Sequence, residues 1–186
     1  MASSEVEICN SALIKVGADR IISLTDDTER ARVVAEQYPK ARDEMLRAHP
    51  WNFAIARVEL GSTGTPEFEF DNEFLLPSDC LRVLKTDLGD DDEYKIEGRK
   101  LLTNNSSIKI KYIKRITDVS MFDASFTEVL AIRLAYDIAY RITNSSTQAT
   151  ALYQLYSLAL RDARSFDAQE GSADRIISDE WLNSRF

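Results

Sequence analysis

Strand-like alternation is confined to the middle of this chain, and helical periodicity flanks it on both sides. Apolar residues recur every three or four positions in 5–16 and 29–48, and again in 125–142 and 146–163, as on one face of a helix. Between these segments, short runs alternate apolar and polar residues, as strands do. Helices and strands do not alternate regularly, which argues against a parallel sheet of repeated β-α units. The pattern predicts an α+β fold that is mostly α, a helical bundle with an inserted small antiparallel β-sheet.

The change in periodicity also sets the expected domain boundaries. Residues 1–56 and 116–170 are expected to form the helical bundle, and residues 57–115 the inserted β subdomain. Residues 171–186 carry apolar side chains without a persuasive helical cap, so we expect an extended C-terminal tail that is either an attachment device or a frayed end. No apolar stretch reaches the roughly 20 residues of a membrane-spanning helix, and the first residues carry glutamates where a signal peptide needs positive charge. We therefore expect no membrane contact.

Local signals predict where the helices begin and end. Capping-box patterns stand at 4–7 and 125–128, and Ser145 is expected to cap the last helix. Pro39 lies inside the second apolar stripe and lacks a backbone donor, so we expect a kink or a break just before it. His49 is expected to interact with the last carbonyls of the same helix.

The helix that starts near residue 125 is apolar on nearly every side. Its charged residues between Val129 and Arg141 are Arg133, Asp137 and Arg141, which stand four positions apart and therefore share one narrow stripe. A helix of this kind is expected to be central to the fold.

Four or so short strands are expected to form the inserted sheet. Alternation at 67–70, an apolar run at 80–85 and alternation at 108–113 each predict a strand. Residues 94–102 predict a hairpin that turns at Glu97-Gly98.

The charge balance limits the partners of the protein. Its formal net charge is -8, and a protein that mainly grips nucleic acid needs a surplus of lysine and arginine. An acidic surface suits a conduit through which double-stranded DNA slides without specific binding.

No catalytic constellation is visible in the chain. The single histidine, His49, has no orienting partner in the sequence, no cluster of ligands with zinc spacing is present, and Gly61 and Gly64 do not form a phosphate-binding loop. Cys9 and Cys80 lie in apolar segments and are expected to be free thiols. We therefore expect no catalytic residue, no metal and no cofactor.

Two charged runs are candidate contact sites. The acidic run comprises Asp90, Asp91, Asp92 and Glu93, and the basic run comprises Lys109, Lys111, Lys114 and Arg115. Each run is explained by solvent exposure, as a loop and as a sheet face respectively. The alternatives are a channel lining, nucleic-acid contact by the basic run, or pairing between the two runs across neighbouring subunits.

Several segments together resemble the podophage tail tubular protein A family of head-to-tail adaptors. The resemblance extends over roughly residues 5–171, and the segments that carry it are 7–13, 17–18, 23–24, 38–54, 76–83, 94–102, 122–123 and 167–171. It implies a structural virion protein at the head-tail junction, present in the host cytoplasm during assembly. The implied partners are the portal protein, the tail nozzle protein and further copies of itself in a dodecameric ring around the DNA ejection channel.

The resemblance also gives the C-terminal tail a role, because family members dock on the portal through this segment. Its large apolar residues are the expected anchors, since such side chains supply much of the energy of an interface. They are Ile176, Ile177, Trp181 and Phe186.

Other functions fit the same absence of motifs. The alternatives are another phage connector, such as a head-completion or tail-terminator protein, an interaction module unrelated to phages, or a small enzyme whose groups converge only in the fold.

Overall fold

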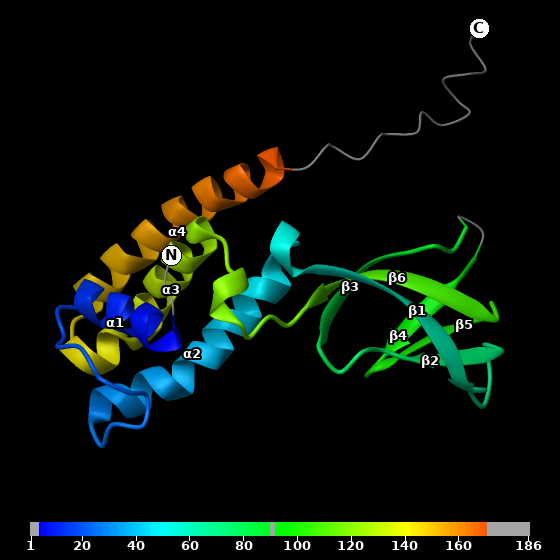
Figure 1. The fold of residues 1–186 in the computed structure, drawn as a ribbon, viewed down its shortest axis with the longest axis horizontal. Coiled ribbons are helices and arrows are strands. Elements are labelled where there is room, and N and C mark those ends of the chain that lie inside the picture. The colour runs from blue at the N-terminus through cyan, green and yellow to red at the C-terminus, as the bar shows by residue number, and fades with distance from the viewer. Residues whose placement is uncertain (1–3, 90–91, 171–186) are drawn as a thin grey trace, which may run out of the picture.

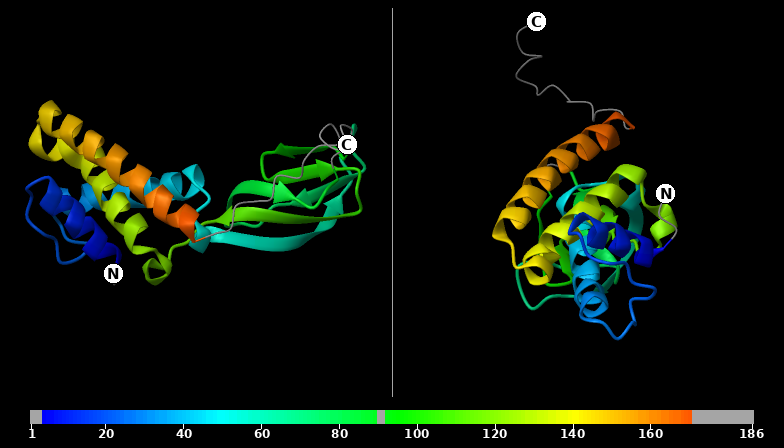
Figure 2. Two further views of the ribbon diagram at one scale, coloured as in Figure 1. Left: turned by 90° about the horizontal axis from the view of Figure 1, so that it is seen from above. Right: turned by 90° about the vertical axis from the view of Figure 1, so that its left-hand side faces the viewer.

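Helices and strands gather at opposite ends of an elongated molecule (Figure 1 and Figure 2). The structure is a computed structural model, and it describes residues 4–89 and 92–170. The helical end contains residues from both ends of the described chain, and the strands come from the middle of it. The predicted α+β fold, mostly α with an inserted antiparallel sheet, is confirmed. The anchors expected in the C-terminal tail lie outside the described residues.

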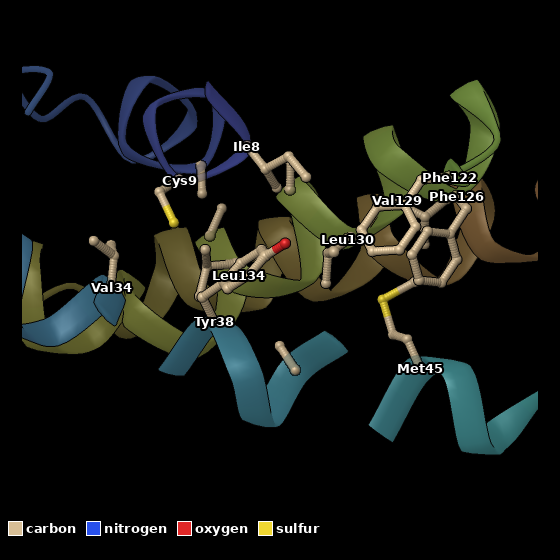
Figure 3. Packing of buried hydrophobic residues seen from close by; sticks show 14 of the residues in the cluster. Ile8, Cys9, Val34, Tyr38, Met45, Phe122, Phe126, Val129, Leu130 and Leu134 are labelled. Atoms are coloured by element: carbon tan, nitrogen blue, oxygen red, sulfur yellow. The ribbon is translucent and has the colours of Figure 1, made fainter. Parts of the chain in front are cut away.

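The bundle consists of α1 (Glu5–Lys15), α2 (Glu29–Ala48), α3 (Ala124–Thr143) and α4 (Ser146–Gln169). α3 contacts each of the other three helices, so it is the central helix, as its sequence predicts. Figure 3 shows how Tyr38 and Met45 of α2 and Ile8 and Cys9 of α1 pack around α3. Two-sided packing explains why α3 is apolar on most of its surface.

The ionic stripe of α3 faces α2. The guanidinium of Arg133 lies 2.9 Å from a carboxylate oxygen of Asp137 and 2.9 Å from one of Glu44 on α2. One turn further on from Asp137, Arg141 pairs with Glu29 at 2.7 Å. These pairs border the apolar contact between the two helices.

Two of the three predicted N-terminal helix caps are confirmed, and the third is wrong. Ser4 accepts a hydrogen bond from the Glu7 amide, and Ser145 accepts one from the Gln148 amide. The capping box predicted at 125–128 is wrong, because α3 begins earlier. Asp123 caps it by accepting bonds from the amides of Ser125 and Phe126, at 2.8 and 3.4 Å.

Pro39 does not break α2, which continues from Glu29 to Ala48. The proline lies on the exposed side of the helix, while Tyr38 and Ala41 beside it are buried. On that side water can bond to a carbonyl that loses its amide partner. Packing of the opposite face against α3 then holds the helix together.

All pairings in the six-stranded sheet are antiparallel, in the order β3-β6-β1-β2-β5-β4, and it curls into an open half-barrel. Its strands are β1 (Ile55–Gly64), β2 (Asn72–Leu75), β3 (Cys80–Thr86), β4 (Tyr94–Glu97), β5 (Lys100–Thr103) and β6 (Ser107–Lys114). β3, β6 and the β4-β5 hairpin agree with the prediction, and Gly98 at the turn has a positive φ of 57°, which glycine adopts without strain.

The sheet also differs from the expectation. It has six strands rather than about four, because β1 and β2 carry weak local signals. The strand predicted at 67–70 is wrong: this segment is a bend in which Glu69 has a φ of 74°.

The described residues form two separate apolar clusters. The larger one fills the bundle and includes Trp51, while the smaller one lies under the sheet and includes Phe74 and Leu101. Arg47 of α2 donates to the carbonyl of Leu81 in β3, and Arg115 pairs with Asp43 of α2 at 2.7 Å. These contacts attach the sheet to the bundle.

Both cysteines are free, as predicted. Burial, with the nearby Glu5 carboxylate adding to it, raises the pKa of Cys9 to about 12. This thiol is therefore protonated and unreactive at ordinary pH. Cys80 is half-buried, and burial raises its pKa as well.

None of the helices in the described ranges has the length and hydropathy needed to cross a membrane.

Candidate interaction surface on the sheet

Lys109 and Lys111 lie on the outer face of β6, opposite the face that enters the sheet core. The neighbouring Ile108 and Ile110 are buried in that core. Because successive side chains of a strand point to opposite faces, the alternation in the sequence correctly placed both lysines.

The tertiary structure adds two further cations to this face. In the antiparallel register, Lys111 stands opposite Arg57 of β1 on one side and opposite Lys85 of β3 on the other. Neighbouring strands are about 4.8 Å apart, so three positive charges form a row across three strands. We call Arg57, Lys85, Lys109 and Lys111 the cationic face.

The cations of this face are not neutralised by direct side-chain contacts in the part of the chain that the structure describes. None of its four side chains forms an ion pair or a hydrogen bond there. Glu59 stands opposite Lys109 in the register, and Asp87 accepts a bond from the backbone amide of Lys109 at 2.7 Å. These two carboxylates leave the face with a net positive charge.

The remaining two cations of the predicted basic run do not belong to this face. Lys114 lies 3.7 Å from Asp79, and Arg115 lies 2.7 Å from Asp43. Both are therefore partnered within the chain and have a lower capacity to bind an external anion.

A hollow of about 550 Å³ opens on the cationic face. Besides the four cations it is lined by Glu59, Asp87 and Thr86. Val58 and Ile110 also border it, but their side chains belong to the core on the opposite face of the sheet. The methylene stems and charged ends of the four cations suit an occupant that is both apolar and negatively charged.

The acidic run is only partly described, because Asp90 and Asp91 lie outside the described residues. The carboxylate of Asp92 accepts bonds from the Gly89 amide and the Asn105 side chain, at 3.0 and 3.2 Å, so it is held by its own loop and by the loop between β5 and β6. Glu93 is exposed. No ion pair joins this run to the basic run in the ranges that the structure covers.

Residues 65–71, which we call the Phe68 loop, form a projecting feature that the sequence pattern does not predict. Phe68 is 77% exposed, whereas Phe70 is buried. The φ of 74° at Glu69 and a bond of 2.9 Å from the Phe70 amide to the Phe68 carbonyl turn the chain sharply between the two rings. A strand would place both rings on the same face. The turn residues Gly64 and Pro66 were the available signal.

The expectation that His49 interacts with the last carbonyls of α2 is wrong. Its Nε2 atom lies 3.1 Å from a carboxylate oxygen of Asp167 on α4. The other oxygen of Asp167 accepts a bond of 2.9 Å from the Asn52 amide. Burial lowers the pKa of His49, and the Asp167 carboxylate acts in the opposite direction. The pair fixes the end of α4 to the junction of bundle and sheet.

In 4–89 and 92–170, no three His, Cys, Asp or Glu side chains gather as metal ligands would.

The row of like charges predicts a stabilising substitution. Lys85→Glu places a carboxylate opposite Lys111, so a repulsive cross-strand pair becomes an attractive one. We expect the free energy of unfolding to rise by about 0.5 kcal/mol, measured by urea denaturation at low salt. Lys85→Gln is the matched control and should give a smaller gain. A loss of stability with Lys85→Glu would show that the row is not repulsive.

In comparisons with known proteins, no family model matches the chain and no curated protein matches it significantly.

Proposed function

We propose that this protein is a structural subunit of a podophage head-to-tail adaptor ring, placed between the portal and the tail nozzle, and that it has no catalytic role. The observation that carries the proposal is the two-part build, in which a helical bundle and a half-barrel, each with its own core, occupy opposite ends of one elongated subunit. In a closed ring, each subunit meets its neighbours through two different surfaces and needs further surfaces for the structures above and below. An elongated two-part subunit can separate these contacts.

The outer surface of α4 supports a role in assembly. Leu155, Leu158 and Phe166 are exposed on this helix, while Leu152 and Ala163 pack inward. Exposed apolar side chains that gather along one helix are typical of surfaces covered by another protein.

The segments that carry the family resemblance form structural units in the molecule. Arg99 in the β4-β5 hairpin donates to the carbonyls of Leu76 and Pro77, at 3.1 and 2.6 Å. The segments 76–83 and 94–102, which are separate in the sequence, are thus joined in the sheet. The net charge of -8 fits the part of the proposal in which DNA passes through the ring without binding.

The C-terminal tail is proposed to attach the ring to the portal. Its anchors are Ile176, Ile177, Trp181 and Phe186, which lie outside the described residues. The tail follows α4, whose end is held in place by the bonds of Asp167 to His49 and Asn52. Because the end of α4 is fixed, the tail would begin at the same position on every subunit of the ring.

The test is loading of the purified chain onto the portal of its own phage, measured by native mass spectrometry. We expect a ring of copies to add to the portal, and we expect deletion of residues 172–186 to abolish loading while the chain stays folded. Trp181→Ala with Phe186→Ala should weaken loading strongly, because aromatic anchors dominate interface energy. Asn183→Ala is the control in the same segment. A full-length chain that never loads onto the portal would refute the adaptor function, and a ring that forms equally well without a portal would favour another connector.

A further inference from the structure

We propose that the Phe68 loop of one copy inserts into the hollow of the cationic face of a second copy. This contact rests on the proposed ring and specifies the interface between neighbouring subunits.

The Phe68 loop presents a ring between two acidic residues. Phe68 is the large aromatic side chain with the highest exposure in the described part of the chain. Glu67 is exposed and forms no ion pair in that part, while Glu69 pairs with Lys95 at 2.7 Å. Lys95 also lies 5.8 Å from the centre of the Phe70 ring, which is buried. These contacts hold the base of the loop in place. Because the loop is already ordered, burying the ring of Phe68 against a partner would cost little conformational entropy.

The hollow offers complementary chemistry. The methylene stems of Arg57, Lys85 and Lys111 can pack against an aromatic ring, and their charged ends can stack on its face. Arg57 and Lys111 stand side by side without carboxylate partners of their own in the described ranges, and Glu67 can supply one. An acidic-aromatic-acidic segment therefore satisfies both the apolar and the charged part of the lining.

The two surfaces cannot meet within one chain. β1 runs from the hollow at Val58 to Gly64 before the loop begins, which is about 20 Å at about 3.3 Å per residue. The loop lies at the end of β1 that is far from the bundle (Figure 1). A contact between two different surfaces of identical chains is heterologous, and repetition of it with a closing rotation produces a ring.

A nucleic-acid backbone is a poorer occupant of the hollow. Glu59 and Asp87 line it together with the cations, and phosphates gain nothing from the methylene stems of the cations. The net charge of -8 also opposes the approach of DNA. Duplex DNA is therefore included as an alternative ligand in the test.

The experiment uses two variants that each disable one surface. Phe68→Ala removes the loop anchor and keeps the face, whereas Arg57→Glu with Lys85→Glu reverses the face and keeps the loop. Neither change is expected to unfold the protein, because Phe68 is exposed and the two glutamates would flank Lys111 with opposite charges. Association is measured by sedimentation velocity for the free chain and by native mass spectrometry on the portal.

We expect each variant alone to associate at least about tenfold more weakly than the wild type. An equal mixture of the two should stop at heterodimers, since one variant supplies the intact face and the other the intact loop. Lys40→Glu on α2 is a charge-reversal control away from both surfaces and should assemble as the wild type does.

The outcomes separate this contact from the adaptor function. Variants that load onto the portal as fully as the wild type would overturn the contact and leave the adaptor function standing. A wild type that does not load would overturn the adaptor function itself. If the face variant assembles normally but loses binding of duplex DNA that Phe68→Ala retains, the face is a phosphate-binding surface and the contact is wrong.

Discussion

Replacing Trp51 with alanine is expected to lower the free energy of unfolding by about 4 kcal/mol, a typical cost for truncating a fully buried aromatic side chain. Trp51 is 1% exposed and stands edge-on to the ring of Phe126, with 5.1 Å between the ring centres. Its indole nitrogen donates to the carbonyl of Met45 at 3.0 Å. The substitution therefore leaves a cavity where α2 ends and removes the donor for a buried carbonyl.

Urea denaturation followed by circular dichroism measures this loss. Met121→Ala is the control, because Met121 also lies near the bundle-sheet junction but is 51% exposed, and exposed substitutions usually change stability by less than about 0.5 kcal/mol. Equal effects of the two substitutions would mean that Trp51 does not hold the junction together.

Phe74→Ala is expected to destabilise the β subdomain by about 4 kcal/mol and to leave the bundle folded. Phe74 is 0% exposed, and its cluster under the sheet is separate from the bundle core. The sheet should then open locally, since separate cores can unfold at different free energies. Hydrogen exchange is the measurement: we expect amides of β2, β5 and β6 to lose protection while those of α3 keep it.

Phe68→Ala is a matched control, because it removes the same side chain from the same subdomain at an exposed position. It should leave hydrogen exchange in the sheet nearly unchanged. Simultaneous loss of protection in α3 and in the sheet after Phe74→Ala would show that the two parts unfold as one unit, despite their separate cores.

Local sequence signals determined most of the helical bundle. The caps at Ser4 and Ser145 act within three residues, and the apolar stripes of α1 and α4 repeat along single helices. The alternation of β6 and the glycine of the β4-β5 hairpin are equally local. Such features depend on neighbours in the chain, so they can be predicted without the fold.

Only the tertiary structure decided the features that depend on partners distant in sequence. Packing against α3 keeps α2 continuous at Pro39, and pairing with β6 makes β1 a strand although its alternation is weak. The Phe68 loop, which alternates like a strand, is a bend because Phe70 is buried while Phe68 is left outside. Arg57 and Lys85 join Lys111 through strand register, which no local pattern encodes. The sequence thus determined two cations of the candidate surface, and the pairing of strands assembled all four.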